Sequence, residues 1–541
     1  VEIGTDMRVL LIQSYLTAQI DNPGIFLQEP IGLLSIATYI ENKLGDLVDI
    51  KVLDLFEQGK GRVNKNGDQL ISGLNDEKKI CEHIRDFNPD IVGITANFTT
   101  YFPDVIALGR IISSNFRETK LVLGGAHATM DAENILRHYS FFDYIVRREG
   151  ESTFLELLLA SMQHKNNNLS DIKGLTYREG GKIISNEDRP LIDDINILPM
   201  PDRKFINMDF YKECNCKTLA FARKTPVATI ITSRGCPFNC IFCSTKNMWE
   251  RKFRAFSAER VVAEIKHLYG NYGVKEFAIM DDQFIIDKKR VESICDYIIE
   301  LNLDISFSMP AGTSIWIADE NLLRKMKKAG FYRLCFPVES GNENTMKFIR
   351  KPINLSKVSN VVKLASKLGF WTSGNFIIGF PYETREEILT TIKYAYECGV
   401  DYPVFLIAQP FKGAELYDVF VKEELLKKHR GSHTAGTMYD SKCLRADEIN
   451  ELYQKAVKSM FRNKIKFYLK PANFYYYMFP KLRTYEDIKY FMKLLDIVVL
   501  NQKILPMILY NISIDQLNIL KRILVILSFL FGQTILLILM I

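Results

Sequence analysis

The stretch SRGCPFNCIFCSTKNMW, residues 233–249, decides how the rest of this sequence is interpreted. Its three cysteines follow the pattern C-x3-C-x2-C and are Cys236, Cys240 and Cys243. A structural zinc site would need a fourth Cys or His ligand. No histidine lies between residues 164 and 267, and a predicted strand separates the loop from Cys214 and Cys216. A cubane iron–sulfur cluster can leave one iron open, so the spacing favours a [4Fe-4S] cluster on these three thiolates.

Outward from the cysteines, residues 228–425 alternate short apolar runs with amphipathic segments. The six apolar runs are ATIITSRG, EFAIMDD, DISFSMPAG, YRLCFPVES, WTSGNFIIGF and YPVFLIAQP. This alternation predicts an α/β domain over residues 223–425, a partial (β/α)6 TIM-like barrel with its chemistry at the carboxyl ends of the strands. The cysteine loop follows the first of these strands. We expect Gly235 and Pro237 to shape the loop and Phe242 to offer an aromatic surface to a cofactor.

Residues 7–150 show the same alternation of Val/Ile-rich runs and helical segments. They predict a Rossmann- or flavodoxin-like parallel sheet with helices on both faces. Such sheets bind ligands beyond the carboxyl ends of their strands. Two segments fall there, ITANFTT at 94–100 and GGAHAT at 124–129. The second does not match GxGxxG, and a tight strand-to-helix turn is the alternative explanation for its glycine pair.

The remaining segments carry weaker signals. Residues 151–222 are predicted to be a linker or connector, with a polar stretch at 164–171 and a hairpin through Gly180 and Gly181. Residues 426–541 are predicted to be mostly helical. The predicted fold is therefore two α/β domains joined by a connector and followed by a helical region.

The last part of the sequence is apolar. Residues 523–541 read ILVILSFLFGQTILLILMI, contain no charge and follow the basic pair Lys521 and Arg522. The run approaches the roughly 20 residues that cross a hydrocarbon core, and a basic flank favours the cytoplasmic side. We expect a membrane anchor or a helix that lies on the membrane, with a buried C-terminal helix as the alternative.

Composition limits the classes of partner and compartment. A chain of 541 residues is long enough for several domains. The net charge of +6 is too small to argue for a nucleic-acid partner. Most of the ten cysteines stand alone in apolar runs, which indicates reduced thiols, and no signal peptide is recognisable at the start. We expect a cytoplasmic protein, associated with the cytoplasmic face of a membrane through its tail.

The cysteine loop, written C-x3-C-x-F-C, resembles the radical S-adenosylmethionine (SAM) superfamily, whose open iron binds SAM. FAIMDDQF, FPVESGNENTMKFIRK and FIIGFPYET resemble the later strand-end motifs of that family, in the same order. The resemblance implies that Phe242 touches adenine, Asp282 lies near the methionyl end and Glu339 binds ribose. The SAM contacts that it implies are Phe242, Asp282, Glu339, Ser340 and Gly379. MPAGTSIWIADENLL lacks an Arg that many relatives carry, so that contact is missing or relocated.

The N-terminal half resembles the cobalamin-binding domain of cobalamin (B12)-dependent radical SAM enzymes. The resemblance rests on PIGLLSIATYIE, PDIVGITAN, LVLGGAHATMDAENIL and DYIVRREGESTFLELL, and in total covers residues 7–425. The implied cobalamin contacts are Thr95, Asn97, Gly124, Gly125, Ala126, His127, Glu149 and Gly150. The D-x-H-x-x-G motif that supplies a histidine to cobalt elsewhere is absent. The cobalt is therefore expected to lack a protein histidine, and His127 has no predicted cobalt role.

The resemblance implies reductive cleavage of SAM at the [4Fe-4S] cluster to a 5′-deoxyadenosyl radical. The expected outcome is C-methylation of an unactivated carbon or an oxidative cyclisation, and the sequence names no catalytic residue beyond the cofactor contacts. A tRNA methylthiotransferase-like enzyme is an alternative, but such enzymes carry three N-terminal cysteines and this half has only Cys81. A non-catalytic cobalamin or SAM sensor is a second alternative. The expected partners are a small-molecule or lipid substrate and an electron donor such as flavodoxin or ferredoxin, with no nucleic acid.

Overall fold

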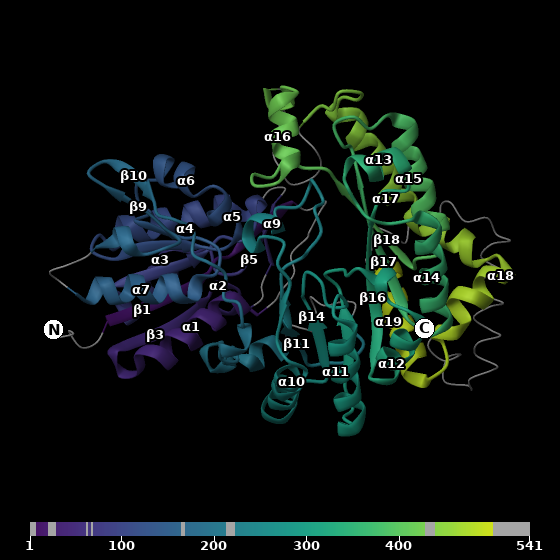
Figure 1. Ribbon diagram of the computed structural model, residues 1–541, viewed down its shortest axis with the longest axis horizontal. Coiled ribbons are helices and arrows are strands. Elements are labelled where there is room, and N and C mark those ends of the chain that lie inside the picture. The colour runs from purple at the N-terminus through teal and green to yellow at the C-terminus, as the bar shows by residue number, and fades with distance from the viewer. Residues whose placement is uncertain are drawn as a thin grey trace.

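The structure is a computed structural model with two sheets side by side along the longest axis, as Figure 1 shows. The residues that it describes are 7–19, 29–60, 63–66, 69–163, 168–212, 222–427 and 439–500. Short helix α9 (Thr245–Trp249) lies between the two sheets. Cys214, Cys216 and the apolar tail 523–541 fall outside the described residues.

The first sheet has seven strands in the order β10-β9-β8-β7-β6-β1-β3. Its strands are β1 (Met7–Gln13), β3 (Val48–Asp54), β6 (Ile91–Thr95), β7 (Lys120–Gly124), β8 (Tyr144–Val146), β9 (Leu175–Glu179) and β10 (Lys182–Ser185). Strands β3, β1, β6, β7 and β8 run parallel. Their central residues are buried, as expected when helices cover both faces of a parallel sheet.

Helices cover the first sheet on both sides, as the sequence predicts. The helices of this half are α1 (Ile31–Leu44), α2 (Leu55–Gln58), α3 (Glu77–Phe87), α4 (Phe102–Asn115), α5 (Ala126–Met130), α6 (Ala132–His138) and α7 (Gly150–Met162). Helices α1 and α7 pack together in one apolar core, whereas α3 and α4 contribute to a second. A small antiparallel sheet was not predicted, because its four-residue strands show no clear apolar alternation. Its strands are β2 (Leu16–Gln19), β4 (Val63–Asn66) and β5 (Gln69–Ser72).

The second sheet consists of six parallel strands in sequence order, so each predicted apolar run forms one strand. The strands are β11 (Val227–Ile230), β14 (Glu276–Ile279), β15 (Ser306–Met309), β16 (Phe331–Glu339), β17 (Trp371–Ile378) and β18 (Tyr402–Ile407). Phe307 stacks on Phe277 and Phe331, with ring centroids 5.5 and 4.8 Å apart, and this joins three neighbouring strands. The α/β fold class predicted from the sequence is confirmed.

Helices connect these strands, and a short two-stranded ladder flanks the cysteine loop. The further helices are α10 (Ala258–Tyr272), α11 (Lys288–Leu301), α12 (Glu320–Lys328), α13 (Glu343–Phe348), α14 (Leu355–Lys367), α15 (Arg385–Glu397) and α16 (Glu415–Lys422). The ladder pairs β12 (Ser233–Arg234) with β13 (Arg254–Ala255). Helix α15 begins with a capping box, in which Thr384 and Glu387 each bond the other's backbone N–H, so it begins directly after the FIIGFPYET motif.

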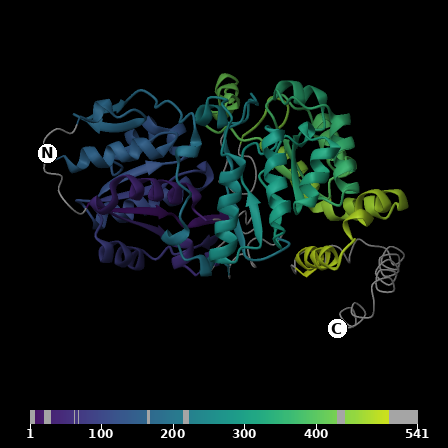
Figure 2. The same cartoon turned by 60° about the horizontal axis from the view of Figure 1, so that its bottom comes forward.

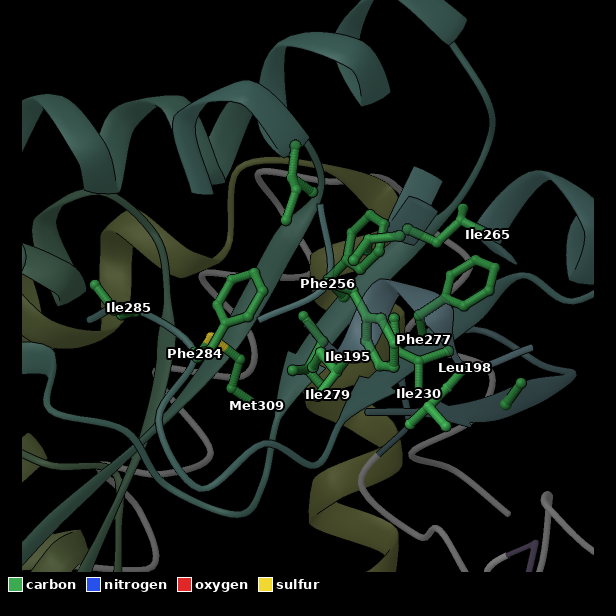
Figure 3. Close-up of a cluster of buried hydrophobic side chains, with 14 of the residues drawn as sticks. Ile195, Leu198, Ile230, Phe256, Ile265, Phe277, Ile279, Phe284, Ile285 and Met309 are labelled. Atoms are coloured by element: carbon green, nitrogen blue, oxygen red, sulfur yellow. The ribbon is translucent and has the colours of Figure 1, made fainter. Parts of the chain in front are cut away.

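The connector packs tightly against both domains. Its predicted hairpin forms β9 and β10, and β9 pairs antiparallel with β8 of the first sheet. Ile195 and Leu198 lie beside Ile230 and Phe277 of the second domain (Figure 3). Arg203 is only 1% exposed and donates to Glu264 over 2.8 Å. The connector is therefore part of the folded core rather than a loose linker.

The C-terminal region is helical in the part that the structure describes. It comprises α17 (Ala446–Tyr468), α18 (Pro471–Asn473) and α19 (Tyr485–Leu500). Figure 2 shows this yellow region beside and below the second domain, away from the first sheet. Within the described ranges, no helix has both the length and the apolar character that a membrane span needs. The expectation of a membrane anchor rests on residues 523–541, which are not among them.

Candidate functional site

The cysteine loop is fixed at its centre by backbone hydrogen bonds. Ile241 is buried, its N–H donates to the Ile349 carbonyl over 3.2 Å, and its own carbonyl accepts from Leu416 over 2.8 Å. The three cysteines are partly exposed and form no disulfide. The loop is thus anchored by backbone bonds to two distant segments, while its thiols stay accessible.

Burial makes an isolated thiolate unfavourable in this loop. It raises the pKa of Cys236 and raises that of Cys240 to about 11, although the ammonium of Lys351 opposes the second shift. Cationic irons would compensate for the negative charge of the thiolates. No three acidic, Cys or His side chains among the described residues are arranged around a single-ion position. A four-iron cube spreads its ligands more widely than one ion does, so this finding is compatible with a cluster.

The ammonium of Lys351 interacts electrostatically with Cys236 and Cys240, a role that the sequence did not indicate. The side chain of Lys351 is 8% exposed, and its Nζ lies 3.1 Å from Glu339 and 5.5 Å from the Trp316 ring centroid. Burial lowers the pKa of Lys351, but Glu339 and Cys240 outweigh it and leave the pKa above its ordinary value. A charged Lys351 therefore neutralises the carboxylate of Glu339.

Glu339 adopts a strained backbone at the end of β16. Its φ is +73°, which is uncommon for a residue with a side chain, and the register between β16 and β17 shifts between Pro337 and Glu339. Strain of this kind is concentrated at functional sites. The turn directs a buried carboxylate toward the cysteine loop, where the resemblance places the ribose of SAM.

The adjacent acids Asp281 and Asp282 differ in environment. Asp281 is 3% exposed and accepts from the Ser233 hydroxyl over 2.6 Å and from Thr232, so it anchors the segment before the cysteine loop. Asp282 is accessible to solvent although protein surrounds it densely, and that burial raises the pKa of its carboxyl, with Asp281 adding to the effect. The Gly235 backbone and the Trp249 side chain act in the opposite direction and lower that pKa. Only Asp282 is therefore available to a ligand.

The other predicted SAM contacts lie around the same loop. Phe242 lies with its ring centroid 6.1 Å from that of Phe380. The Gly379 N–H donates to Glu383 over 2.7 Å, and burial raises the pKa of Glu383 to about 7. Ser340 is fully buried, and its hydroxyl is 2.9 Å from that of Thr391. Ser340 therefore shapes the strand end through its own neighbours.

The carboxyl edge of the first sheet brings most of the predicted cobalamin residues together. Thr95 is paired with Gly124 at the ends of β6 and β7. Gly125 has φ +100°, and a Cβ built there would lie 2.5 Å from Asn97 Oδ1. Asn97 also accepts from the Ala126 N–H over 3.3 Å. Only glycine fits between these two strand-end loops.

His127 faces the protein interior. Its side chain is 7% exposed, its ring centroid is 4.3 Å from that of Phe102, and Nδ1 lies 3.0 Å from the Thr99 hydroxyl. Burial lowers its pKa, so the ring is neutral at pH 7. Nε2 is buried without a hydrogen-bond partner in the part of the chain that the structure describes.

Glu149 and Gly150 lie at the end of β8, but Glu149 is directed toward the second domain. Its carboxylate accepts from Arg234 over 2.6 Å, from Arg254 over 2.9 Å and from the Ile192 N–H over 2.8 Å. Both of its oxygens are therefore occupied by protein groups. Glu149 joins the domains, a role that the sequence did not indicate.

The two strand-end edges meet each other. Helix α5, which follows the glycine pair, contacts α9, which follows the cysteines. Asn247 of α9 donates to the Gly413 carbonyl over 2.7 Å, and Met130 of α5 lies so close to Gly413 that a Cβ there would collide with it. The cysteine loop thus adjoins the carboxyl edge of the first sheet.

Comparison with known proteins decides which family shares this arrangement. The Radical SAM superfamily pattern matches residues 230–395, and the B12 binding domain pattern matches residues 26–158. The chain is 36% identical over 408 residues to the uncharacterized methyltransferase PH0819 of Pyrococcus horikoshii, covering 74% of this chain and 84% of that protein. This chain belongs to the radical SAM superfamily and carries a B12-binding domain. The predicted family is therefore confirmed.

A second relative and a solved structure are also similar to this radical SAM enzyme. The anaerobic magnesium-protoporphyrin IX monomethyl ester cyclase of Cereibacter sphaeroides is 25% identical over 405 residues, covering 74% of this chain and 63% of the cyclase. The structure of the radical SAM methyltransferase TsrM from Kitasatospora setae, with cobalamin and a [4Fe-4S] cluster bound, has a TM-score of 0.60 at 16% identity. It covers 79% of this chain and 80% of TsrM, and it supports the fold.

The residues at these sites of the radical SAM enzyme fit the cofactors of the family. Three accessible cysteines in a desolvated loop suit a [4Fe-4S] cluster, and the accessible Asp282 beside it suits the amino group of SAM. The glycine pair lets the two strand-end loops of the first sheet pack closely, and Asn97 is exposed at this edge, where cobalamin would bind. The cofactors of the enzyme are thus a [4Fe-4S] cluster, SAM and cobalamin.

Proposed function

We propose that this radical SAM enzyme methylates an unactivated carbon of a small-molecule substrate. The observation that carries the proposal is the contact of α5 with α9, which brings the cobalamin edge beside the cysteine loop. The similarity to a protein named as a methyltransferase supports methyl transfer, whereas the more distant cyclase supports oxidative cyclisation as a second candidate. Cobalamin is useful as a methyl carrier only if it lies near the site where SAM is cleaved.

Residues of this chain would bind and orient the cofactors. When bound, the cluster supplies the electron that cleaves one SAM molecule, and cobalamin carries a methyl group from a second. The three cysteines hold the cluster, and Phe242, Asp282 and Glu339 bind SAM, with Lys351 neutralising Glu339. Ser340 and Gly379 complete the SAM site, and the chain divides into its domains at residues 150, 222 and 425.

The proposed function is tested by measuring two products of SAM, and these can be measured before the substrate is identified. Protein reconstituted anaerobically with iron, sulfide and cobalamin receives SAM and a reductant, and mass spectrometry follows S-adenosylhomocysteine and 5′-deoxyadenosine. We expect both, with S-adenosylhomocysteine in proportion to bound cobalamin and absent without cobalamin. 5′-Deoxyadenosine alone would favour cyclisation, and neither product would favour a sensor. A second cluster, at about eight irons per chain, would favour a methylthiotransferase-like enzyme.

We propose that cobalt in this site has no protein histidine ligand, because the His127 ring is packed against Phe102. Replacing His127 by alanine is expected to leave the electron paramagnetic resonance spectrum of Co(II)-cobalamin unchanged, while thermal stability falls through lost packing. An imidazole-nitrogen splitting in the wild-type spectrum that disappears in the variant would contradict this. His138→Ala, on the exposed side of α6, is the matched control.

We also propose that the C-terminal region contacts an anionic membrane surface. The electron donor, such as flavodoxin or ferredoxin, would bind to a different surface of the enzyme. Tyr475, Phe479 and Tyr485 are 63%, 53% and 78% exposed, which is unusual for aromatic side chains. The exposed charged residues between 462 and 489 are all basic, and they are Arg462, Lys466, Lys470, Arg483 and Lys489. Aromatic and basic side chains gather where proteins meet lipid headgroups. The apolar run 523–541 would strengthen such a contact.

The membrane proposal is tested by comparing full-length protein with a version that ends at Asn518. We expect the full-length protein in the membrane fraction, and the shortened one released from it but still bound to anionic vesicles at low salt. Changing Tyr475, Phe479 and Tyr485 to serine should remove the remaining vesicle binding. If both versions stay soluble and do not bind vesicles, and the shortened one is less stable, the tail belongs to the protein core and the membrane proposal is wrong.

A further inference from the structure

Four buried charged side chains join the two domains beside the cysteine loop. This interface ion cluster consists of Glu149, Glu151, Arg234 and Arg254. Arg234 donates to Glu149 and to Glu151, each over 2.6 Å, and Arg254 also donates to Glu149. None of the four side chains is more than 14% exposed. Arg234 holds the pKa of Glu151 below its ordinary value although burial opposes this.

The interface ion cluster connects the two cofactor sites by short routes. Glu149 and Glu151 flank Gly150 at the start of α7, a few residues after β8 ends and thus near the cobalamin edge. Arg234 ends β12, two residues before Cys236. The fork of one guanidinium therefore bridges two carboxylates of the B12-binding domain at the point where the cysteine loop begins.

Trp249 extends the cluster to the predicted SAM site. The guanidiniums of Arg234 and Arg254 lie 6.0 and 5.6 Å from the centroid of its ring. The side chain of Trp249 also lowers the pKa of Asp282, so the two side chains lie close together. A series of neighbouring groups thus runs from the cobalamin edge through Arg234 and Trp249 to a carboxylate beside the cysteines.

Stability alone does not account for the interface ion cluster. Replacing a buried ion pair by apolar groups is often neutral or stabilising, because desolvation offsets the attraction. Nε and Nη2 of Arg254 are buried without hydrogen-bond partners among the described residues, so the arrangement is not optimised for stability. The forked geometry of an Arg between two carboxylates instead fixes direction and distance.

We propose that Arg234 is a positioning residue that sets the distance and orientation between cobalamin and the cysteine-bound cluster. The proposal rests on the proposed function, in that both cofactors are bound. Arg234 itself would touch neither cofactor. It acts by holding the start of the cysteine loop against the start of α7.

The decisive variant removes both partners of one pair, Arg234→Met with Glu151→Gln, so that no buried charge is left unpaired at Glu151. We expect iron and cobalamin contents and thermal stability close to wild type. The spin interaction between Co(II) and the reduced cluster, measured by relaxation enhancement in frozen solution, should change at least two-fold. Arg324→Lys, at an exposed Arg that pairs with Glu320, is the control and should change nothing.

A conservative variant separates positioning from stability. Arg234→Lys keeps the charge but cannot bridge two carboxylates in the same way. It should also alter the spin interaction while retaining both cofactors. A wild-type spin interaction in the double variant and in Arg234→Lys would overturn the proposal, since the domains would then hold their geometry without the fork.

Failure of the proposed function would be recognised separately. If the wild-type protein takes up no cobalamin, the proposed function fails, and hydrogen exchange of the cofactor-free protein decides the role of Arg234. Arg234→Lys should then speed amide exchange in residues 146–156 and 230–236, but not in α12. Unchanged exchange in both segments would overturn the positioning role as well.

Discussion

Changing Cys236, Cys240 and Cys243 together to alanine is expected to lower the iron content from about four per chain to background. The loop that contains them is anchored through the Ile241 backbone rather than through the thiols, so the fold should survive the loss of the cluster. Circular dichroism should therefore be unchanged, while the visible absorption of the cluster and the formation of 5′-deoxyadenosine disappear.

The control for the cysteine variant is Cys443→Ala, because Cys443 is exposed and lies outside the loop. It should keep all of its iron. Retention of about four irons in the triple variant would show that other thiols hold the cluster. Cys214 and Cys216 would then be the first candidates.

Replacing Gly235 by alanine is expected to abolish most cluster assembly without removing a single ligand. Gly235 has φ +95°, a conformation that costs other residues about 1–3 kcal/mol. An added Cβ would collide with the carbonyl oxygen of Lys252, and it would lie 3.0 Å from the Trp249 side chain. The backbone that precedes Cys236 must therefore move, and iron content after reconstitution measures the effect.

The matched control for Gly235 is Gly181→Ala in the β9–β10 turn. Gly181 also has a positive φ, +76°, but an added Cβ there meets open space. Gly181→Ala therefore carries only the cost of the backbone conformation, whereas Gly235→Ala carries that cost and the collision. If Gly235→Ala assembles as much iron as Gly181→Ala, the cysteine loop tolerates displacement, and the steric argument is wrong.

The sequence predicted features whose signal is local. The strand runs and the hairpin through Gly180 and Gly181 can be read within a few residues, and each forms as expected. The small antiparallel sheet was missed because its strands are too short for a periodic signal. Local patterns therefore predicted the two main domains but not the additions to them.

Contacts between distant segments could not be predicted from one sequence. Glu149 lies at the start of α7, but its partner Arg234 is 85 residues away in the sequence, and nothing in the local pattern pairs them. Lys351 stands inside the quoted motif FPVESGNENTMKFIRK, and its type alone does not show that it is buried beside Glu339. Both roles depend on which side chains the folded chain brings together.

The pairing of β9 with β8 bears on the modularity of this enzyme. A fragment that stopped at residue 150 would expose the whole edge of β8, where unpaired N–H and C=O groups invite association with other chains. It would also lack α7, which covers the face beside α1. A B12-binding domain expressed alone or fused to another protein therefore has to include residues up to 185. A fragment with a shorter boundary would aggregate instead of folding as an independent domain.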